Sequence, residues 1–477
     1  MSKTLTSSLF IDGEWKDGDA GEDFAVIDPS DYSEITRFVV ASQDECLAAV
    51  DAADRAFPAW AALAPRERSV ILRRAFEIMR EEREEIAEII VRENGKSFQD
   101  ALTEVDYANE FFRWFAEEAV RVPGDYRLSP GGDKRIIVTR EPIGVALLIT
   151  PWNFPAAMAT RKIGPALAAG CTVILKPARE TLLTAARIVD ILDRAGVPRG
   201  VVNLVTPVPT GPAVSAMLHH PAVRKLSFTG STEVGRILLH EAADNVVSSS
   251  MELGGNAPFL VLEGADVEKA VEGSVLAKMR NGGSACTAAN RFYVHRDLHD
   301  EFVQRLSDAF GEYRVGPGID RGNTLGALVS RGERDKVAEL VTRATDDGAK
   351  VVQGGGEVDG GAFYEPTVLV DVAHGSEINR TEIFGPVAAV VAFDEVDDAV
   401  RMANDTEYGL IAYVFGEEKG ALRVAHRLDA GMVGVNRGVL SDPAAPFGGM
   451  KQSGLGREGS SEGILEFMEG NYIGIAV

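Results

Sequence analysis

The sequence predicts an α/β protein with two domains built on parallel sheets and a small β extension. Its 477 residues, 45% hydrophobic and 25% charged, are too many for one core and suit two or three globular domains. From Gly144 onward, short apolar runs alternate with helical segments, which is typical of parallel strands joined by crossover helices. The same alternation resumes after Cys286.

The first hundred residues are predicted to be mainly helical. Ser42 and Glu45 have the spacing of a capping box, so we expect a helix from there to about Ala62. Pro65 stands where a second helix would begin, because proline is tolerated at the first helical position. The polar stretch Met1–Phe10 lacks the apolar core of a secretion signal.

Five apolar, β-rich runs are predicted as strands of the first alternating block. They are Gly144–Thr150, Cys171–Lys176, Val201–Val205, Lys225–Thr229 and Pro258–Leu262. Ligands of parallel sheets lie at the carboxyl ends of the strands. We therefore expect the chemistry in three following loops, Pro151–Phe154, Lys176–Glu180 and Thr229–Gly235.

A second α/β domain is predicted from four further runs. They are Arg291–His295, Ala388–Phe393, Leu410–Phe415 and Met432–Val435. The last residues, Asn471–Val477, are predicted to form a terminal strand. The stretch Val120–Thr139 is expected to pair with it as a small β extension of the kind that often makes oligomer contacts.

Charge and cysteine content exclude several classes of partner. Asp and Glu number 72 against 49 Lys and Arg, which argues against binding nucleic acid or anionic lipid. No stretch approaches the roughly 18 apolar residues that cross a bilayer. Three cysteines, an odd and sparse count, favour a reducing, cytoplasmic compartment. The seven histidines show no metal-ligand spacing with cysteines, so no metal is expected.

Two glycine-containing segments are candidates for a phosphate-binding loop. Gly454–Gly459 spells G-x-G-x-x-G, but it follows no clear strand, so a tightly turned loop is the preferred interpretation. Phe228–Gly235 follows a predicted strand and opens a helix, where glycine lets backbone approach a pyrophosphate. An ordinary helix start is the alternative at that position.

Three residues stand out as candidates for catalysis. Cys286 is surrounded by small residues, although a lone cysteine is usually a small buried hydrophobe. Glu252 lies between Met251 and Leu253, where burial would raise its pKa toward that of a useful general base; an exposed strand end is the alternative. Asn153, held between two prolines, has an amide that would donate to an oxyanion or merely cap the next helix.

Seven segments together, in order and spacing, resemble the aldehyde dehydrogenase superfamily from about Phe10 to the C-terminus. They are Pro151–Pro155, Lys176–Ala178, Phe228–Gly235, Glu252–Gly255, Cys286, Glu382–Pro386 and Pro446–Gly449. The resemblance implies a cofactor-binding domain of residues 1–119 and 140–251 and a catalytic domain of residues 252–445. Residues 120–139 and 446–477 would form an oligomerisation extension of a homodimer or homotetramer.

The resemblance also implies the catalytic roles. Cys286 would attack the aldehyde, and the thiohemiacetal would pass hydride to the nicotinamide and leave a thioester. Asn153 and the Cys286 backbone N–H would stabilise the oxyanion. Glu252 would activate the water that hydrolyses the thioester to a free acid.

For the cofactor, NADP or NAD, the resemblance and the loops imply a set of binding residues. They are Trp152, Lys176, Pro177, Ala178, Arg179, Gly230, Ser231, Gly235, Leu253, Glu382 and Phe384. NAD-preferring relatives often carry a glutamate three residues after the lysine, where this chain has Arg179. A guanidinium pairs with a 2′-phosphate, so NADP is favoured, although the adjacent Glu180 would weaken the preference.

The nearest subfamily resemblance is to succinate-semialdehyde dehydrogenases. It implies that Arg161, Arg280 and Ser441 hold the distal carboxylate of the substrate, with guanidinium forks suited to that anion. The alternative is that these arginines pair with acidic side chains. Glutarate semialdehyde, a sulfonated aldehyde or an aromatic aldehyde remain alternative substrates. A non-catalytic protein on the same scaffold is disfavoured because Cys286 and Glu252 are both present.

Three positions depart from the family pattern. Ser284 and Ala285 precede the nucleophile where the family commonly has Gln-Thr, which we expect to alter the polarity of the loop. Arg437 follows Asn436 and is expected near the substrate mouth, where a third cation would admit a bulkier or more highly charged anion.

Overall fold

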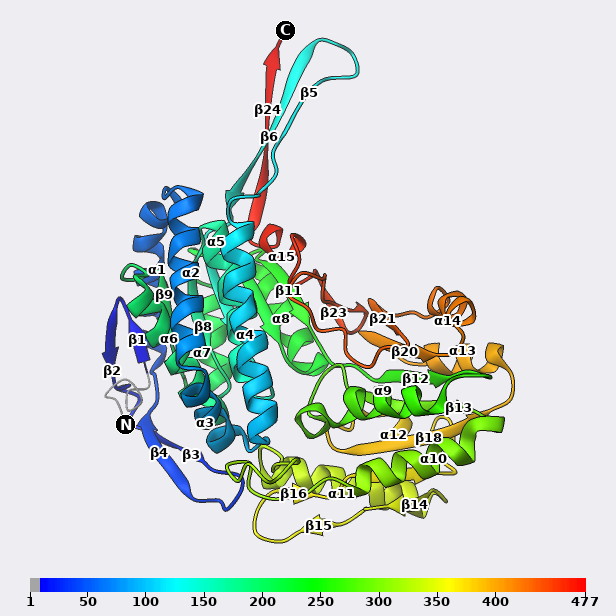
Figure 1. Ribbon diagram of the computed structural model, residues 1–477. Helices are drawn as coiled ribbons and strands as arrows, with labels where there is room; N and C mark the ends of the chain where they lie inside the picture. Colours follow the sequence, from blue (N-terminus) through cyan, green and yellow to red (C-terminus); the bar gives the residue numbers. More distant parts are fainter. Residues whose placement is uncertain (1–8) are drawn as a thin grey trace.

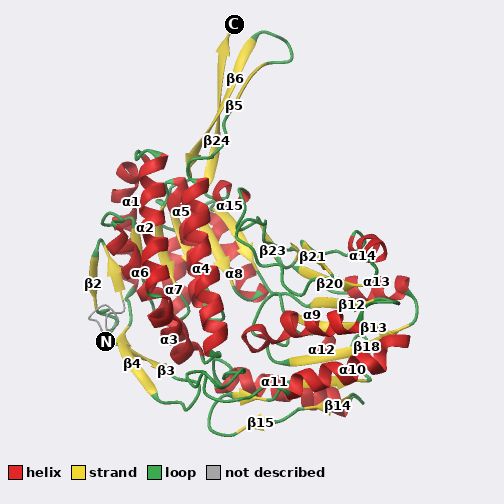
Figure 2. Ribbon diagram, in the orientation of Figure 1, coloured by secondary structure: helices red, strands yellow, loops and turns green. Residues whose placement is uncertain are grey.

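The protein folds into two lobes from which a β arm projects (Figure 1). This computed structural model describes residues 9–477; the stretch Met1–Ser8, where we expect no secretion signal, lies outside the described residues. The first lobe carries most of the N-terminal half of the chain, and the second lobe carries most of the C-terminal half. Figure 2 shows helices packed against the strands of both lobes.

The first lobe is built on an eight-stranded sheet with the order β2-β1-β9-β8-β7-β10-β11-β23. The strands are β2 (Glu14–Lys16), β1 (Leu9–Ile11), β9 (Val202–Leu204), β8 (Thr172–Lys176), β7 (Val145–Ile149), β10 (Val223–Thr229), β11 (Ser248–Glu252) and β23 (Gly454–Leu455). The five strands from β9 to β11 are parallel, as the alternation predicted. Their carboxyl ends therefore meet at one edge of the sheet.

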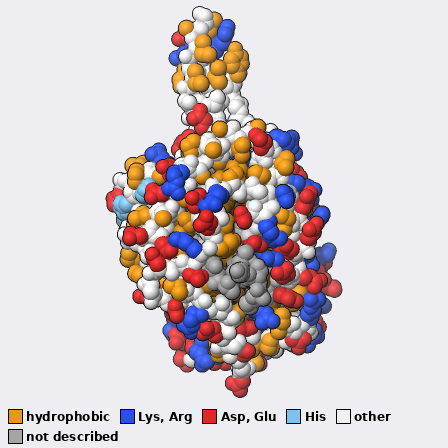
Figure 3. Space-filling model, turned by 90° about the vertical axis from the view of Figure 1, so that its left-hand side faces the viewer, with side chains coloured by type: hydrophobic (Ala, Val, Ile, Leu, Met, Phe, Trp, Pro, Cys, Tyr) orange, Lys and Arg blue, Asp and Glu red, His pale blue; other side chains and the backbone are white. Residues whose placement is uncertain are grey.

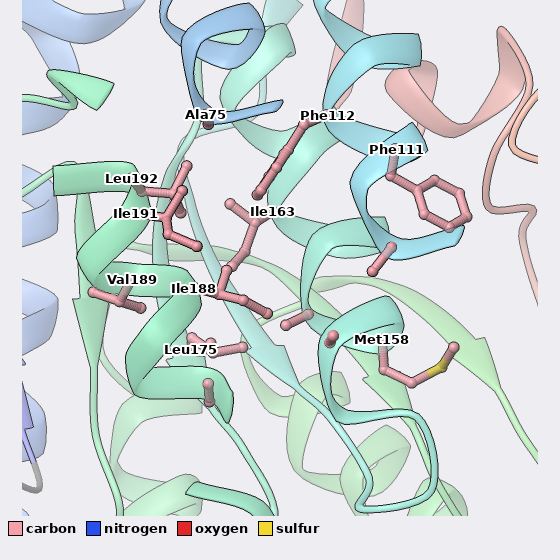
Figure 4. Close-up of a cluster of buried hydrophobic side chains, with 14 of the residues drawn as sticks. Ala75, Phe111, Phe112, Met158, Ile163, Leu175, Ile188, Val189, Ile191 and Leu192 are labelled. Atoms are coloured by element: carbon pink, nitrogen blue, oxygen red, sulfur yellow. The ribbon is translucent and has the colours of Figure 1, made fainter. Parts of the chain in front are cut away.

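The helices of this lobe fix the loops at that edge. They are α1 (Gln43–Ala61), α2 (Pro65–Glu81), α3 (Arg83–Asn94), α4 (Phe98–Glu118), α5 (Pro155–Ala169), the 3-10 turn η2 (Arg179–Thr181), α6 (Leu182–Ala195), α7 (Thr210–Leu218), α8 (Thr232–Asp244) and α15 (Glu462–Leu465). The predicted capping box is confirmed, because Ser42 Oγ accepts from Glu45 N and Glu45 Oε2 accepts from Ser42 N, each at 3.2 Å. Figure 4 shows Ile163 of α5, Leu175 of β8 and Ile188 of α6 within one buried cluster.

The second lobe holds a seven-stranded sheet with the order β14-β17-β18-β13-β12-β20-β21, parallel except for β14. The strands are β14 (Lys350–Gln353), β17 (Thr367–Val370), β18 (Val387–Phe393), β13 (Ala289–His295), β12 (Ala257–Val261), β20 (Ile411–Phe415) and β21 (Met432–Val435). The helices are α9 (Val267–Met279), η3 (Arg280–Gly283), α10 (Arg296–Gly311), α11 (Arg331–Asp346), α12 (Glu377–Arg380), α13 (Val396–Asn404) and α14 (Glu418–Ala425). Two short pairs, β15 (Glu357–Val358) with β16 (Phe363–Tyr364) and β19 (Tyr408–Gly409) with β22 (Met450–Lys451), complete the strands of this part.

The arm consists of β5 (Asp125–Leu128), β6 (Lys134–Pro142) and β24 (Met468–Ala476). The last strand pairs antiparallel with β6 from Met468 opposite Pro142 to Ala476 opposite Lys134. The predicted pairing of the terminal strand with the preceding extension is therefore confirmed. Orange hydrophobic side chains are prominent on the arm in Figure 3, where it rises above the body of the molecule.

One prediction about the strands was incomplete and another was wrong. The first hundred residues are mainly helical, as predicted, but they also contain the hairpin β3 (Asp23–Ile27) and β4 (Glu34–Val39), besides β1 and β2, because such short strands show no clear period. The prediction that Pro258–Leu262 belongs to the first block is wrong, since the corresponding strand β12 lies in the second sheet. The first sheet instead uses β11, whose polar Ser248–Ser250 run hid it.

Candidate active site

The strand ends of the first lobe open into a long cleft that continues toward the second lobe. The cleft has a volume of about 720 Å³ and is lined by all three loops expected to carry the chemistry. A second cavity of about 320 Å³ contains Cys286. The two cavities share Pro151, Thr229, Gly230 and Ser231 in their walls, so they adjoin.

Cys286 lies between η3 and β13, and its side chain faces the smaller cavity. A Cβ on Gly255 would stand 2.5 Å from the carbonyl oxygen of Cys286, so only glycine allows this close approach. Burial raises the pKa of the Cys286 thiol to about 12, against the opposing effect of the Arg161 guanidinium. The thiol therefore needs a base or a local positive potential to become a thiolate near neutral pH.

Glu252 ends β11 and is buried, with 3% of its surface exposed. Its Oε2 atom has no hydrogen-bond partner among the described residues. Burial, and next the neighbouring Glu458 carboxylate, raise the pKa of Glu252 well above its usual value. An unpaired buried carboxyl with a raised pKa has the properties required of a general base near neutral pH.

A charged cluster that the sequence did not indicate lies beside Glu252. Glu458 accepts from Lys162 Nζ at 2.6 Å and from Arg161 at 3.3 Å, and all three side chains are buried. Although burial opposes it, the two cations lower the pKa of Glu458. Glu458 belongs to the Gly454–Gly459 segment, for which a tightly turned loop is the preferred interpretation, and that segment contributes this carboxylate. The only feature of the sequence that points to Glu458 is its position as an acidic residue between glycines.

Asn153 lies in the buried turn between β7 and α5. Its Nδ2 donates to Ser284 O at 3.2 Å, which ties the predicted oxyanion residue to the loop of the nucleophile. Asn281 Nδ2 donates to both Asn153 O and Ser284 O, at 2.8 and 2.9 Å, and so links the same two loops. Asn281 has a φ of 54°, a left-handed conformation that asparagine tolerates better than most residues. The sequence did not indicate that Asn281 joins the Asn153 loop to the loop of the nucleophile.

A buried ion pair supports the Asn153 loop from below. Lys96 Nζ donates to Asn153 O at 2.7 Å and pairs with Glu104 at 2.5 Å. The other oxygen of Glu104 accepts from Ala156 N at 2.8 Å at the start of α5, where the helix dipole favours an anion. Neither residue was predicted, because Asn153 and Ala156, the backbone positions that they hold, lie more than 50 positions away in the chain.

The residues that line the long cleft have the chemistry to bind a dinucleotide. Lys176 reaches it from the end of β8, and its amine makes no hydrogen bond or ion pair with the described residues. Ser231 caps α8 by accepting from Val234 N at 3.3 Å. An unpaired ammonium group and a helix N-terminus at one cleft provide positive potential for a pyrophosphate and its ribose.

Most predicted cofactor residues line one of the two cavities. The long cleft has Lys176, Pro177, Ala178, Arg179, Gly230 and Ser231 in its walls, and the smaller cavity has Trp152, Leu253, Glu382 and Phe384. Gly235 lines neither. A Cβ there would stand 2.5 Å from Leu253 Cδ2, so this glycine permits packing of α8 against the strand rather than contact with a ligand.

Aromatic and acidic groups enclose the cysteine end of the cleft. The rings of Trp152 and Phe384 meet edge to face with centroids 5.4 Å apart. Glu382 accepts from Gly255 N at 3.2 Å, and burial raises the pKa of its carboxyl to about 7. An aromatic pair and a buried carboxyl at this end have the chemistry to pack against a ring and to accept from hydroxyl groups.

The two predicted substrate arginines differ in their surroundings. Arg280 donates to Ser441 Oγ at 3.3 Å and makes no ion pair with any described residue. It lies where the smaller cavity meets a third cavity of about 680 Å³. Arg161 already pairs with Glu458 and donates to Tyr107 Oη at 3.0 Å, so the alternative interpretation, pairing with acidic side chains, applies to it. It nevertheless lines the smaller cavity.

The departures from the family pattern lie at three places. Ser284 Oγ donates to Phe384 O at 3.3 Å, so it ties the nucleophile loop to the predicted nicotinamide wall. Ala285 lines the smaller cavity. Arg437 donates to Val439 O at 2.8 Å and is not among the wall residues of the described cavities, so a third cation at the substrate mouth is not found.

The sequence profile of the aldehyde dehydrogenase family matches residues 15–473. The chain belongs to the aldehyde dehydrogenase family. This confirms the predicted α/β fold and the prediction of an NAD(P)-dependent aldehyde dehydrogenase. No helix among residues 9–477 is long and apolar enough to cross a membrane.

Curated relatives align with nearly the whole length of the chain. The NADP-dependent succinate-semialdehyde dehydrogenase GabD of Escherichia coli K12 is 45% identical over 100% of this chain and 99% of its own length. A glutarate-semialdehyde dehydrogenase of Pseudomonas putida KT2440 is 45% identical over 100% and 99%. A 3-sulfolactaldehyde dehydrogenase of Pseudomonas putida is 45% identical over 98% and 97%. The crystal structure of the succinate-semialdehyde dehydrogenase of Burkholderia pseudomallei superposes with a TM-score of 0.98 at 42% identity, covering 100% and 99%.

Replacing Glu458 by glutamine is expected to move the acid limb of the pH profile of kcat, which reports hydrolysis of the thioester, to lower pH. The Glu458 charge raises the pKa of Glu252, and its loss also frees Lys162 and Arg161 to act on Glu252. A base with a lower pKa stays ionised, and active, at lower pH. Steady-state aldehyde oxidation measured across pH checks this.

Glu118→Gln is the matched control, since Glu118 is buried like Glu458 but pairs with Arg121 at the end of α4, at 2.9 Å. This control is expected to leave the acid limb in place. An acid limb that moves upward in Glu458→Gln would contradict the electrostatic role of Glu458.

Proposed function

We propose that the protein oxidises succinate semialdehyde to succinate, with NADP preferred over NAD. The observation that carries the substrate is Arg280, which has no ion-pair partner within residues 9–477 and lies at the wall of the cavity that holds Cys286. A guanidinium with Ser441 beside it binds a carboxylate in a fork. A short substrate with an aldehyde at one end and a carboxylate at the other suits a cavity of about 320 Å³.

In the proposed mechanism, Cys286 gives its thiol proton to solvent water, and its sulfur attacks the aldehyde carbon to give a thiohemiacetal oxyanion. The second amide hydrogen of Asn153 and the Cys286 N–H stabilise the oxyanion, because Ser284 O already holds the Asn153 side chain in place. A bound nicotinamide would supply the hydride acceptor, and loss of hydride from the thiohemiacetal carbon would leave a thioester on Cys286. Glu252 then takes a proton from water, and the hydroxide displaces the cysteine thiolate as succinate forms.

Two other acid-terminated substrates remain as alternatives. Glutarate semialdehyde is one methylene longer, and a sulfonated aldehyde presents a different anion to the same guanidinium. The relatives named above support each of them. Steady-state kcat/KM for all three, with butanal as the uncharged reference, tests the proposal. Equal kcat/KM for butanal and succinate semialdehyde would contradict it.

NADP is preferred in this proposal because of Arg179. This side chain is 60% exposed at the wall of the long cleft, where a 2′-phosphate would pair with it. Replacing Arg179 by methionine is expected to lower the ratio of kcat/KM for NADP to that for NAD by about tenfold, after allowance for its exposure. Arg199→Met, which removes an equally exposed arginine paired with Glu14, is the control. An unchanged ratio in Arg179→Met would contradict the assignment.

The arm is proposed as the contact of a homodimer or homotetramer. Tyr126, Leu128 and Tyr472 are 66%, 56% and 56% exposed on it, which is unusual for large apolar side chains on an extended surface. We also propose that residues 1–119 with 140–251 form the cofactor-binding domain, residues 252–445 the catalytic domain, and residues 120–139 with 446–477 the oligomerisation extension. A cytoplasmic location is proposed from the sparse cysteines.

A further inference from the structure

The β3–β4 hairpin closes one side of the long cofactor cleft. Phe24 of β3 and Phe38 of β4 stand opposite each other across the hairpin, and both rings line the cleft. The start of β3 lies against η2, the short turn that carries Arg179. An element that the sequence did not predict therefore shapes the part of the cleft where we place the 2′-phosphate.

Phe24 lies beneath the guanidinium of Arg179. The central guanidinium carbon is 5.2 Å from the centroid of the Phe24 ring, a cation–π distance. Arg179 Nε donates to Glu180 Oε1 at 3.3 Å, while its two terminal nitrogens have no partner among the described residues. The ring and the carboxylate together hold the guanidinium at the cleft and leave its terminal donors for an anion.

The hairpin is held at its far end as well. Pro29 O, at the tip, accepts from Ala362 N of the second lobe at 2.8 Å. The ring of Tyr32, also at the tip, lies under the Arg331 guanidinium at 4.5 Å. Because the tip is fixed to the second lobe, Phe24 is a firm support for Arg179.

We propose that Phe24 is a specificity-determining positioning residue that orients Arg179 for a 2′-phosphate-bearing nucleotide. A long, exposed arginine loses rotamer entropy when it binds an anion, and a supporting ring reduces that loss in advance. The effect is confined to the phosphomonoester, since a nucleotide with a free 2′-hydroxyl makes no use of the oriented guanidinium. This inference rests on the proposed preference for NADP.

The experiment compares Phe24→Leu with Phe24→Tyr in the full-length enzyme. Leucine keeps the apolar packing and removes the ring face, whereas tyrosine keeps the ring. Phe24→Leu is expected to lower the NADP-to-NAD ratio of kcat/KM by roughly two- to fivefold. Phe24→Tyr is expected to keep the ratio of the unmodified enzyme. Inhibition by adenosine 2′,5′-bisphosphate relative to AMP reports the same subsite without turnover and is expected to weaken by the same factor.

Phe38→Leu is the matched control, because this ring lines the same cleft from the opposite strand. It is expected to change kcat/KM for both nucleotides by the same factor. In an Arg179→Met background, Phe24→Leu is expected to have no further effect on the ratio, since the group it positions is gone.

The outcomes separate this inference from the proposed function. If Arg179→Met lowers the ratio but Phe24→Leu does not, the role of Phe24 is overturned and the NADP assignment stands. If Phe24→Leu lowers both kcat/KM values equally, Phe24 supports the cleft in general and the inference is again overturned. If Arg179→Met leaves the ratio unchanged, the NADP assignment fails and the inference fails with it.

Discussion

Replacing Glu252 by glutamine is expected to give an enzyme that forms about one equivalent of NADPH per active site and then nearly stops. Hydride transfer needs Cys286, while hydrolysis of the thioester needs a base that takes a proton from water. Steady-state turnover is therefore expected to fall by about 10²- to 10⁴-fold. Rapid mixing with succinate semialdehyde and NADP measures the burst, and mass spectrometry of the quenched protein detects the acyl group on Cys286.

Cys286→Ser provides the control, since without the thiol neither the burst nor the acyl-enzyme is expected. A Glu252→Gln enzyme that shows no burst would contradict a role in hydrolysis alone. Burial raises the pKa of the Cys286 thiol to about 12, so a missing burst would mean that Glu252 also removes the thiol proton. The single-turnover rate as a function of pH then separates the two roles, because alkaline pH would restore a burst limited by thiolate formation.

The parts of the site that the sequence predicted are those carried by local patterns. The Asn153 turn shows as two prolines around a polar residue, and the Cys286 loop as a run of small residues. The strands before these loops show as apolar runs, because parallel strands are buried on both faces. Such signals require only neighbours in the chain.

The missed parts depend on contacts between distant segments. Lys162 meets Glu458 across 296 positions, and Lys96 meets the Asn153 loop across 57. No local pattern distinguishes a buried, paired lysine from the many exposed charges of this acidic chain. The β3–β4 hairpin was missed because most of it is exposed or half-buried, with only Val26 and Phe38 fully covered, so its apolar residues do not alternate regularly.

Arg161 and Arg280 are both predicted to bind the substrate carboxylate, but their surroundings in the structure differ. Arg161 is buried, pairs with Glu458 and stacks on Phe447 at 4.1 Å. Removing it would leave Glu458 short of one partner and would disturb Glu252, whatever the substrate. Arg280 makes no ion pair with any described residue, so its charge remains available to an incoming anion.

Replacing Arg280 by alanine is therefore expected to lower kcat/KM for succinate semialdehyde by about 10²-fold, while that for butanal changes little. The guanidinium contributes charge-assisted hydrogen bonds that only the acid-terminated substrate makes. Arg161→Met is the informative comparison, since it is expected to lower kcat/KM for both substrates. Steady-state assays of both variants with both aldehydes give the four values.

A similar fall for both substrates in Arg280→Ala would contradict the carboxylate site, because the arginine would then support the cavity in general. A selective fall would leave the identity of the anion to be decided by the substrates themselves. Glutarate semialdehyde and a sulfonated aldehyde would lose the same factor as succinate semialdehyde, since each meets the same guanidinium. Discrimination among the three must therefore come from chain length and the shape of the cavity, where Ala285 and Ser441 stand in the wall.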